Sequence, residues 1–179
     1  NKFILTALLI AAPCLLHAED TKDEVARFGL YTELKLDESF RQHGTEAGAL
    51  NLTLGFEPIK KLSVAFNWKP TLTLYNNNDV KTYFSSPDVI GGSIGYRVFR
   101  QKNGTRYVPE GQSLDIRTSI NSTLGGNDLK FTSYDVGLYY YQRKSVSAPV
   151  TGIGFRHTSY HTPGIQDTYC VFIECGFRF

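Results

Sequence analysis

The sequence has little of several features that mark common classes of protein. Its 179 residues include no methionine, three cysteines and one tryptophan, and the formal net charge is only +2. This near balance gives no electrostatic reason to expect a nucleic-acid partner. Aromatic residues make up 13% of the chain, which argues against a disordered protein. At this length we expect one domain.

Long apolar runs are also missing, except at the start of the chain. There, 14 mostly apolar residues (3–16) follow a positively charged residue and precede acidic ones. Such a run is short for a membrane-spanning helix and typical of the core of a secretory signal peptide. We expect a signal peptide over residues 1–18, cleaved after Ala18, and a single domain over 19–179. A lipid anchor at Cys14 or a retained helix is the alternative.

The few cysteines do not suggest a disulfide or a metal site. Cys170 and Cys175 lie five positions apart in one extended run, so they would be roughly 16 Å apart at ~3.3 Å per residue. That separation is too great for a disulfide, and the two side chains would point to opposite faces. No phosphate-binding loop or zinc-ligand spacing is present, so we expect no cofactor and no metal.

Apolar side chains instead recur at every second position, which is the pattern of β-strands. Eight such runs follow the first 26 residues and are joined by local connections. They cover residues 27–36, 50–57, 62–74, 90–98, 114–124, 133–140, 152–156 and 168–179. An even number of strands connected in order predicts an all-β fold, an eight-stranded antiparallel up-and-down barrel.

Alternation alone does not decide which face points outward. In a soluble ligand-binding barrel or sandwich the apolar face would line the core, whereas in a transmembrane β-barrel it would face lipid. Apolar-face aromatics near strand ends and the signal peptide favour lipid outside. The aromatics are Phe28, Phe56, Trp68, Tyr134, Tyr169, Phe177 and Phe179. Ten charged residues would then point inward: Glu33, Lys35, Lys69, Arg97, Asp115, Arg117, Asp135, Arg156, Glu174 and Arg178.

A barrel of eight strands is just wide enough for side chains to fill its interior. We therefore favour a network of ion pairs over a selectivity lining, because an unpaired buried charge costs several kcal/mol. Arg117 and Arg156 are expected to lie among acids such as Glu33, Asp135 and Glu174. A general pore is not expected.

The final run, residues 169–179, resembles the last strand of bacterial outer-membrane proteins, which ends in phenylalanine after alternating apolar residues. The resemblance implies an outer-membrane location and recognition of the terminal aromatic residue by the membrane's insertion machinery. With that end in the periplasm, the connections at 37–47, 76–88, 125–130 and 161–166 would face outside. Those at 58–61, 100–112 and 143–149 would face the periplasm, with a turn at Asn103-Gly104 in the longest.

One short segment suggests chemistry. His157 and Ser159 share the outward face of the seventh run. Asp167 stands just before the eighth run, at a position whose side chain would also point outward. This pattern resembles the outer-membrane lipid A deacylases, eight-stranded barrels with a His-x-Ser pair on the lipid-facing side of the next-to-last strand. The resemblance implies Ser159 as nucleophile, His157 as general base and Asp167 as the orienting acid. The family has Asn after the serine, where this chain has Tyr160, and Glu174 faces the wrong way to serve as the acid.

These observations favour a small, monomeric outer-membrane barrel with a structural or cell-surface role and no enzymatic activity, in contact with outer-membrane lipid and lipopolysaccharide. The alternative is a lipid A deacylase acting through Ser159, His157 and Asp167. A soluble periplasmic lipid carrier with the two faces inverted is a third possibility.

Overall fold

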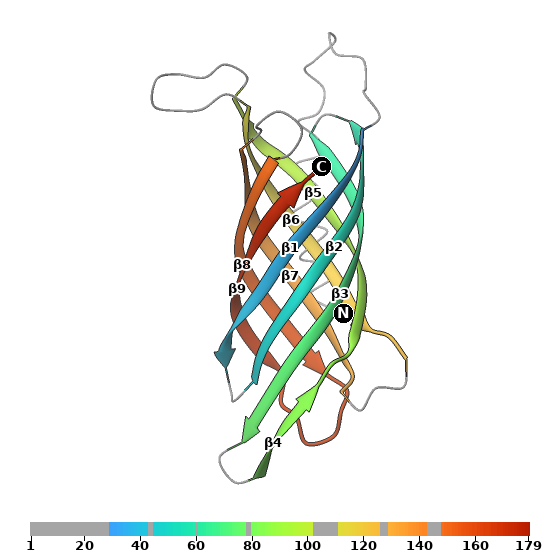
Figure 1. Ribbon diagram of the computed structural model, residues 1–179, viewed down its shortest axis with the longest axis vertical. Coiled ribbons are helices and arrows are strands. Elements are labelled where there is room, and N and C mark those ends of the chain that lie inside the picture. Colours follow the sequence, from blue (N-terminus) through green and yellow to red (C-terminus); the bar gives the residue numbers. More distant parts are fainter. Residues whose placement is uncertain are drawn as a thin grey trace.

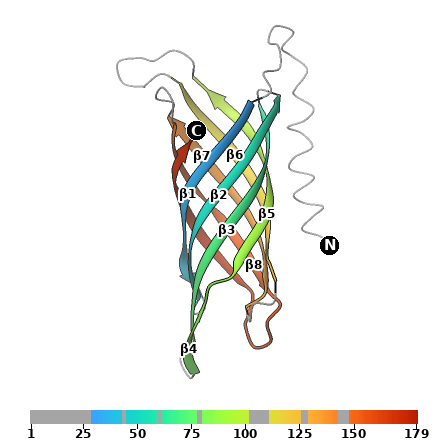
Figure 2. The same cartoon turned by 45° about the vertical axis from the view of Figure 1, so that its right-hand side comes forward.

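The computed structural model describes residues 29–42, 45–59, 61–77, 80–101, 111–125, 129–142 and 148–179. They form an all-β, closed, antiparallel barrel whose strands tilt strongly around its axis (Figures 1 and 2). No helix in this part of the chain is long and apolar enough to cross a membrane. The predicted signal peptide, Cys14, Phe28 and the Asn103-Gly104 turn lie outside the described residues.

Each strand pairs with the next one in sequence, except that β4 and β5 both pair with β3, and β1 closes the barrel by pairing with β9. The strands are β1 (Gly29–Gln42), β2 (Thr45–Ile59), β3 (Leu62–Asn77), β4 (Val80–Ser85), β5 (Asp88–Arg100), β6 (Gln112–Thr123), β7 (Phe131–Gln142), β8 (Ala148–Tyr160) and β9 (Thr168–Arg178). We call the end that carries the C-terminus the terminal end. The opposite end, where β3 turns into β4, is the hairpin end (Figure 1).

The segments β4 and β5 are two parts of one barrel strand. Both pair with β3 in the same register, since Pro70 lies opposite Asp88 and Thr73 opposite Ser85. The break between them falls at Pro87, which has no backbone N–H to donate. Counting them as one strand gives eight, and the predicted eight-stranded up-and-down barrel is confirmed.

Two expected connections at the hairpin end were wrong. Residues 37–47 were predicted to be a loop, but β1 continues to Gln42 and β2 begins at Thr45. Residues 76–88 were also predicted to be a loop, yet most of them belong to β3 and β4. Together these two strands extend beyond the others at the hairpin end (Figure 1). The predicted boundaries followed apolar alternation, whereas backbone hydrogen bonds continue a ladder whatever the side chains are.

The prediction that the apolar face points outward is confirmed. Along β7, Val136 and Leu138 are 51% and 45% exposed, while Asp135 between its apolar neighbours is 4% exposed. The same alternation runs through β1, β3 and β8. The inverted arrangement, with apolar side chains lining a cavity as in a lipid carrier, does not match this facing.

Aromatic rings also enter the interior, where glycines leave room for them. Phe172 is completely buried, and Tyr139 is 6% exposed. A Cβ atom added at Gly154 would lie 2.7 Å from the Phe172 ring, and one added at Gly152 would lie 2.5 Å from the Tyr139 ring. The small inward residues of β8 therefore allow these two rings to fill the barrel.

Candidate functional site

The terminal half of the interior is organised around the carboxylate of Glu33, which is 2% exposed. Arg117 donates to it through Nη1 at 2.7 Å and Nη2 at 2.9 Å, and Arg178 donates through Nε at 2.8 Å. The Tyr141 hydroxyl donates at 3.1 Å, and Lys35 Nζ lies 3.2 Å away. A carboxylate with this many donors is held in one position, and its charge is compensated.

Tyrosine rings pack against the same arginines. The guanidinium carbon of Arg178 lies 3.9 Å from the ring centre of Tyr31 and 4.3 Å from that of Tyr141. Arg117 lies 4.9 Å from the ring centre of Tyr139. Guanidinium groups stack favourably on aromatic faces, so these contacts fill the terminal half as well as compensating its charge.

A second acid joins this group to the neighbouring strands. Glu57 accepts hydrogen bonds from Arg97 Nη2 and Arg178 Nη1, each at 2.9 Å. Arg97 also pairs with Asp115 at 3.1 Å. The ion pairs thus cross from β2 to β5, β6 and β9 without a break.

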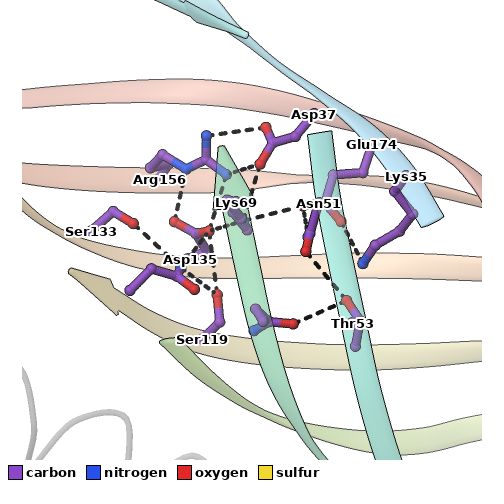
Figure 3. Close-up of polar contacts among 12 residues, drawn as sticks. Lys35, Asp37, Asn51, Thr53, Lys69, Ser119, Ser133, Asp135, Arg156 and Glu174 are labelled. Carbon is purple, nitrogen blue, oxygen red and sulfur yellow. Dashed lines mark hydrogen bonds and ion pairs between the residues drawn. The ribbon is translucent and has the colours of Figure 1, made fainter. Parts of the chain in front are cut away.

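The hairpin half contains a similar cluster, shown in Figure 3. Lys69 Nζ lies 3.0 Å from Asp37, 3.3 Å from Asp135 and 3.3 Å from Glu174. Arg156 pairs with the same two aspartates, at 2.6 Å to Asp37 and 2.9 Å to Asp135. Both cations therefore share carboxylates, which fixes their positions relative to each other.

Glu174 connects the two halves. One of its oxygens lies 2.7 Å from Lys35, while the other lies 3.3 Å from Lys69 and accepts a hydrogen bond from Asn51 at 2.9 Å. Among the residues whose side chains are described, the connected network contains equal numbers of acids and bases. The acids are Glu33, Asp37, Glu57, Asp115, Asp135 and Glu174, and the bases are Lys35, Lys69, Arg97, Arg117, Arg156 and Arg178.

All ten predicted inward charges belong to this network, and Arg117 and Arg156 lie among acids as predicted. Glu174 contacts the two lysines rather than pairing with either arginine. Asp37 and Glu57 also belong to the network, although they were not among the charges predicted to point inward. Asp37 is two residues after Lys35 and four after Glu33, so the same alternation places it inside the barrel, although 37–47 was predicted to be a loop.

The predicted catalytic residues lie at the hairpin end, on the outer surface. Ser159 is half-buried and Asp167 is exposed, while Thr158 between the outward positions of β8 points inward. The Ser159 hydroxyl donates to Asp167 Oδ2 at 3.1 Å, and the Tyr160 backbone N–H donates to Asp167 Oδ1 at 2.9 Å. The structure therefore brings Ser159 and Asp167 into direct contact.

His157 lies on the same outer face, two residues before Ser159. Its Nδ1 is 3.3 Å from the Thr168 carbonyl oxygen. Its ring is stacked between Tyr169, with ring centres 4.3 Å apart, and Tyr134, at 6.1 Å. The closest described partner of the Ser159 hydroxyl is thus the carboxylate, and the assignment of all three residues to catalysis stays a prediction.

The two cysteines in the described part of the chain are free thiols: Cys170 is half-buried and Cys175 is exposed. Within the described ranges, no group of three or more His, Cys, Asp or Glu side chains is arranged to hold a metal ion.

Comparison with known proteins found no family model, no curated protein and no solved structure that matches this chain.

Proposed function

We propose that the protein is a small bacterial outer-membrane barrel with a structural or cell-surface interaction role, whose interior is filled and does not form a general pore. The observation that carries the proposal is the combination of an apolar outer surface with a buried, charge-balanced interior. Unsupported by lipid, so many exposed apolar side chains would favour aggregation.

The outer surface has the composition that a bilayer requires. Leu30, Leu36, Phe155 and Leu54 are 79%, 68%, 73% and 57% exposed. Aromatic side chains lie toward both ends of this surface: Tyr134 and Tyr169 toward the hairpin end, and Tyr140, Phe177 and Phe179 toward the terminal end. Membrane barrels carry such an apolar band between two aromatic girdles.

The proposal includes orientation and partners. The terminal end, with Phe179, would face the periplasm, and the insertion machinery would recognise that residue. The hairpin end would face outside, in contact with lipopolysaccharide, and the protein would act as a monomer. The single chain closes the barrel by itself, because β1 pairs with β9, so closure of the barrel does not need a second copy.

The absence of a pore is directly testable. Purified protein reconstituted into planar bilayers is expected to give no sustained conductance steps above the empty-bilayer background, because ion pairs and tyrosine rings occupy the interior. A known porin reconstituted in the same way provides the positive control. Reproducible conductance steps from correctly folded protein, verified by its altered migration on unheated gels, would contradict the filled-interior proposal.

Lipid A deacylation is a second candidate function, favoured by the hydrogen bond between Ser159 and Asp167 with His157 on the same lipid-facing surface. Ester hydrolysis requires a base to take the serine proton during attack on the acyl carbonyl. Asp167 already accepts that hydrogen bond, and the imidazole of His157 lies nearby on β8. Lipid A would meet these groups from the surrounding outer leaflet.

This candidate is tested by mass spectrometry of lipid A from cells expressing the wild-type protein or Ser159→Ala. If the enzyme proposal is right, lipid A loses an acyl chain only in cells with wild-type protein. Ser122→Ala is a matched control, because Ser122 is an exposed serine at the same end of the barrel, on β6. Identical lipid A in all strains with verified expression would reject the deacylase proposal.

A further inference from the structure

A cavity lies inside the barrel at the hairpin end. Its floor is the ion cluster of Asp37, Lys69 and Arg156. The apolar side chains of Val89 and Phe131 also line the cavity. The space accommodates about three water-sized groups. It belongs neither to the outer-surface residues of the predicted catalytic group nor to the filled terminal half.

The cavity exists because β2 contributes small side chains at this level. Ala47 and Ala49 line it, whereas the next inward residue of β2 is Asn51, which reaches Glu174. From Ala47 onward, where the side chains of β2 are described, no ring or long side chain of this strand lines the cavity. These small side chains therefore leave room at the hairpin end of the barrel.

Hydroxyl groups form much of the wall. Six buried residues contribute them from five different strands: Ser39, Thr71, Thr73, Ser133, Thr158 and Thr168. Thr73 is 2% exposed, and its Oγ1 has no hydrogen-bond partner in the structure. A buried hydroxyl without a partner is costly, so Thr73 Oγ1 is available to form a hydrogen bond with whatever occupies the cavity.

The floor of the cavity favours a neutral molecule over an ion. Lys69 Nζ already lies within 3.3 Å of three carboxylates. Arg156 is bonded to Asp37, Asp135 and the Ser39 hydroxyl. An added anion or cation would have to compete with these existing pairs, whereas a neutral hydroxyl compound would use only the wall groups.

We propose that this cavity binds a small neutral polyol of about the size of glycerol. Hydroxyl side chains donate and accept hydrogen bonds, so a ring of them matches a ligand whose groups do the same. Thr73 Oγ1 would gain a partner, and the carbon atoms of the ligand would contact Phe131 and Val89. This site would give the barrel a binding function at its hairpin end, in addition to the proposed structural role.

Cys170 offers a probe, because it lines the same cavity, whereas Cys175 is exposed on the outer surface. In a variant that keeps Cys170 as its sole cysteine, methyl methanethiosulfonate is expected to modify the thiol in detergent micelles. A concentration series of glycerol should slow this modification several-fold. A Cys175-only variant should show no such protection, and sucrose, which is too large for the cavity, should not protect Cys170.

Two substitutions test the site itself. Ala49→Leu places a larger side chain in the cavity, and Thr73→Val removes the unpartnered hydroxyl with almost no change in shape. Both should abolish or strongly weaken protection by glycerol, and Thr73→Val remains informative if Ala49→Leu does not fold. An unreactive Cys170, equal rates with and without glycerol, or equal protection of both cysteines would overturn the proposal. Unchanged protection in folded Thr73→Val would also overturn it.

Discussion

Replacing Glu33 by alanine is expected to lower the free energy of unfolding by roughly 3–5 kcal/mol. The substitution would leave Arg117, Arg178 and Lys35 in the interior with one carboxylate fewer, and the Tyr141 hydroxyl would lose its acceptor. Such charges cannot move into water without opening the barrel. Urea titration in lipid vesicles, followed by the fluorescence of the single tryptophan, Trp68, measures the effect.

Two further variants separate the network from a general effect of charge removal. Glu38 is an exposed carboxylate on the same strand, so Glu38→Ala should change the unfolding free energy by less than about 0.5 kcal/mol. Adding Arg117→Met to Glu33→Ala should recover part of the loss, because removing both partners leaves no lone charge. If Glu33→Ala were as mild as Glu38→Ala, the ion network would not stabilise the fold.

Leu138→Arg is expected to lower stability in a bilayer by roughly 2–4 kcal/mol, because the side chain faces lipid near the middle of the barrel. Leu138 lies between Ile116 and Ile153 on neighbouring strands and is 45% exposed. In a barrel surrounded by water, an arginine at so exposed a position would have little effect. Urea titration in vesicles, monitored by Trp68 fluorescence, again provides the measurement.

Leu124→Arg is the matched control. Leu124 is also 45% exposed, but it follows the last residue of β6 at the hairpin end. There the cost should fall to about 0–1 kcal/mol, as expected near the membrane interface. Equal costs at the two positions, or stable folding of the wild-type protein as a monomer in buffer without detergent, would contradict the membrane proposal.

The strands could be predicted because their side chains alternate in hydropathy, and period-two alternation needs no knowledge of the partner strand. Runs such as 133–140 carry this signal at nearly every position, and the structure places β7 over them. The signal stopped at Asp37, where inward and outward residues are both polar. The length of β1 could therefore not be predicted from its own residues.

The outer-surface group was only partly predictable. His157 and Ser159 are two positions apart, so any extended strand places them on the same face, whatever its neighbours are. The contact between Ser159 and Asp167 depends on how the chain returns from β8 to β9 through the connection at 161–167. The stacking of His157 between Tyr134 and Tyr169 depends on the registers of two strand pairs.

The number of strands, their order and the residues that share a face could all be predicted from the amino-acid sequence, because each follows from local periodicity and short connections. That the apolar face points outward became certain only from the folded barrel, since alternation is the same for either facing. The folded barrel also decided which charges pair: Glu33 meets Arg117 across 84 residues, and Arg156 meets Asp37 across 119. Such pairs depend on barrel closure, which brings distant strands within a few ångströms of each other.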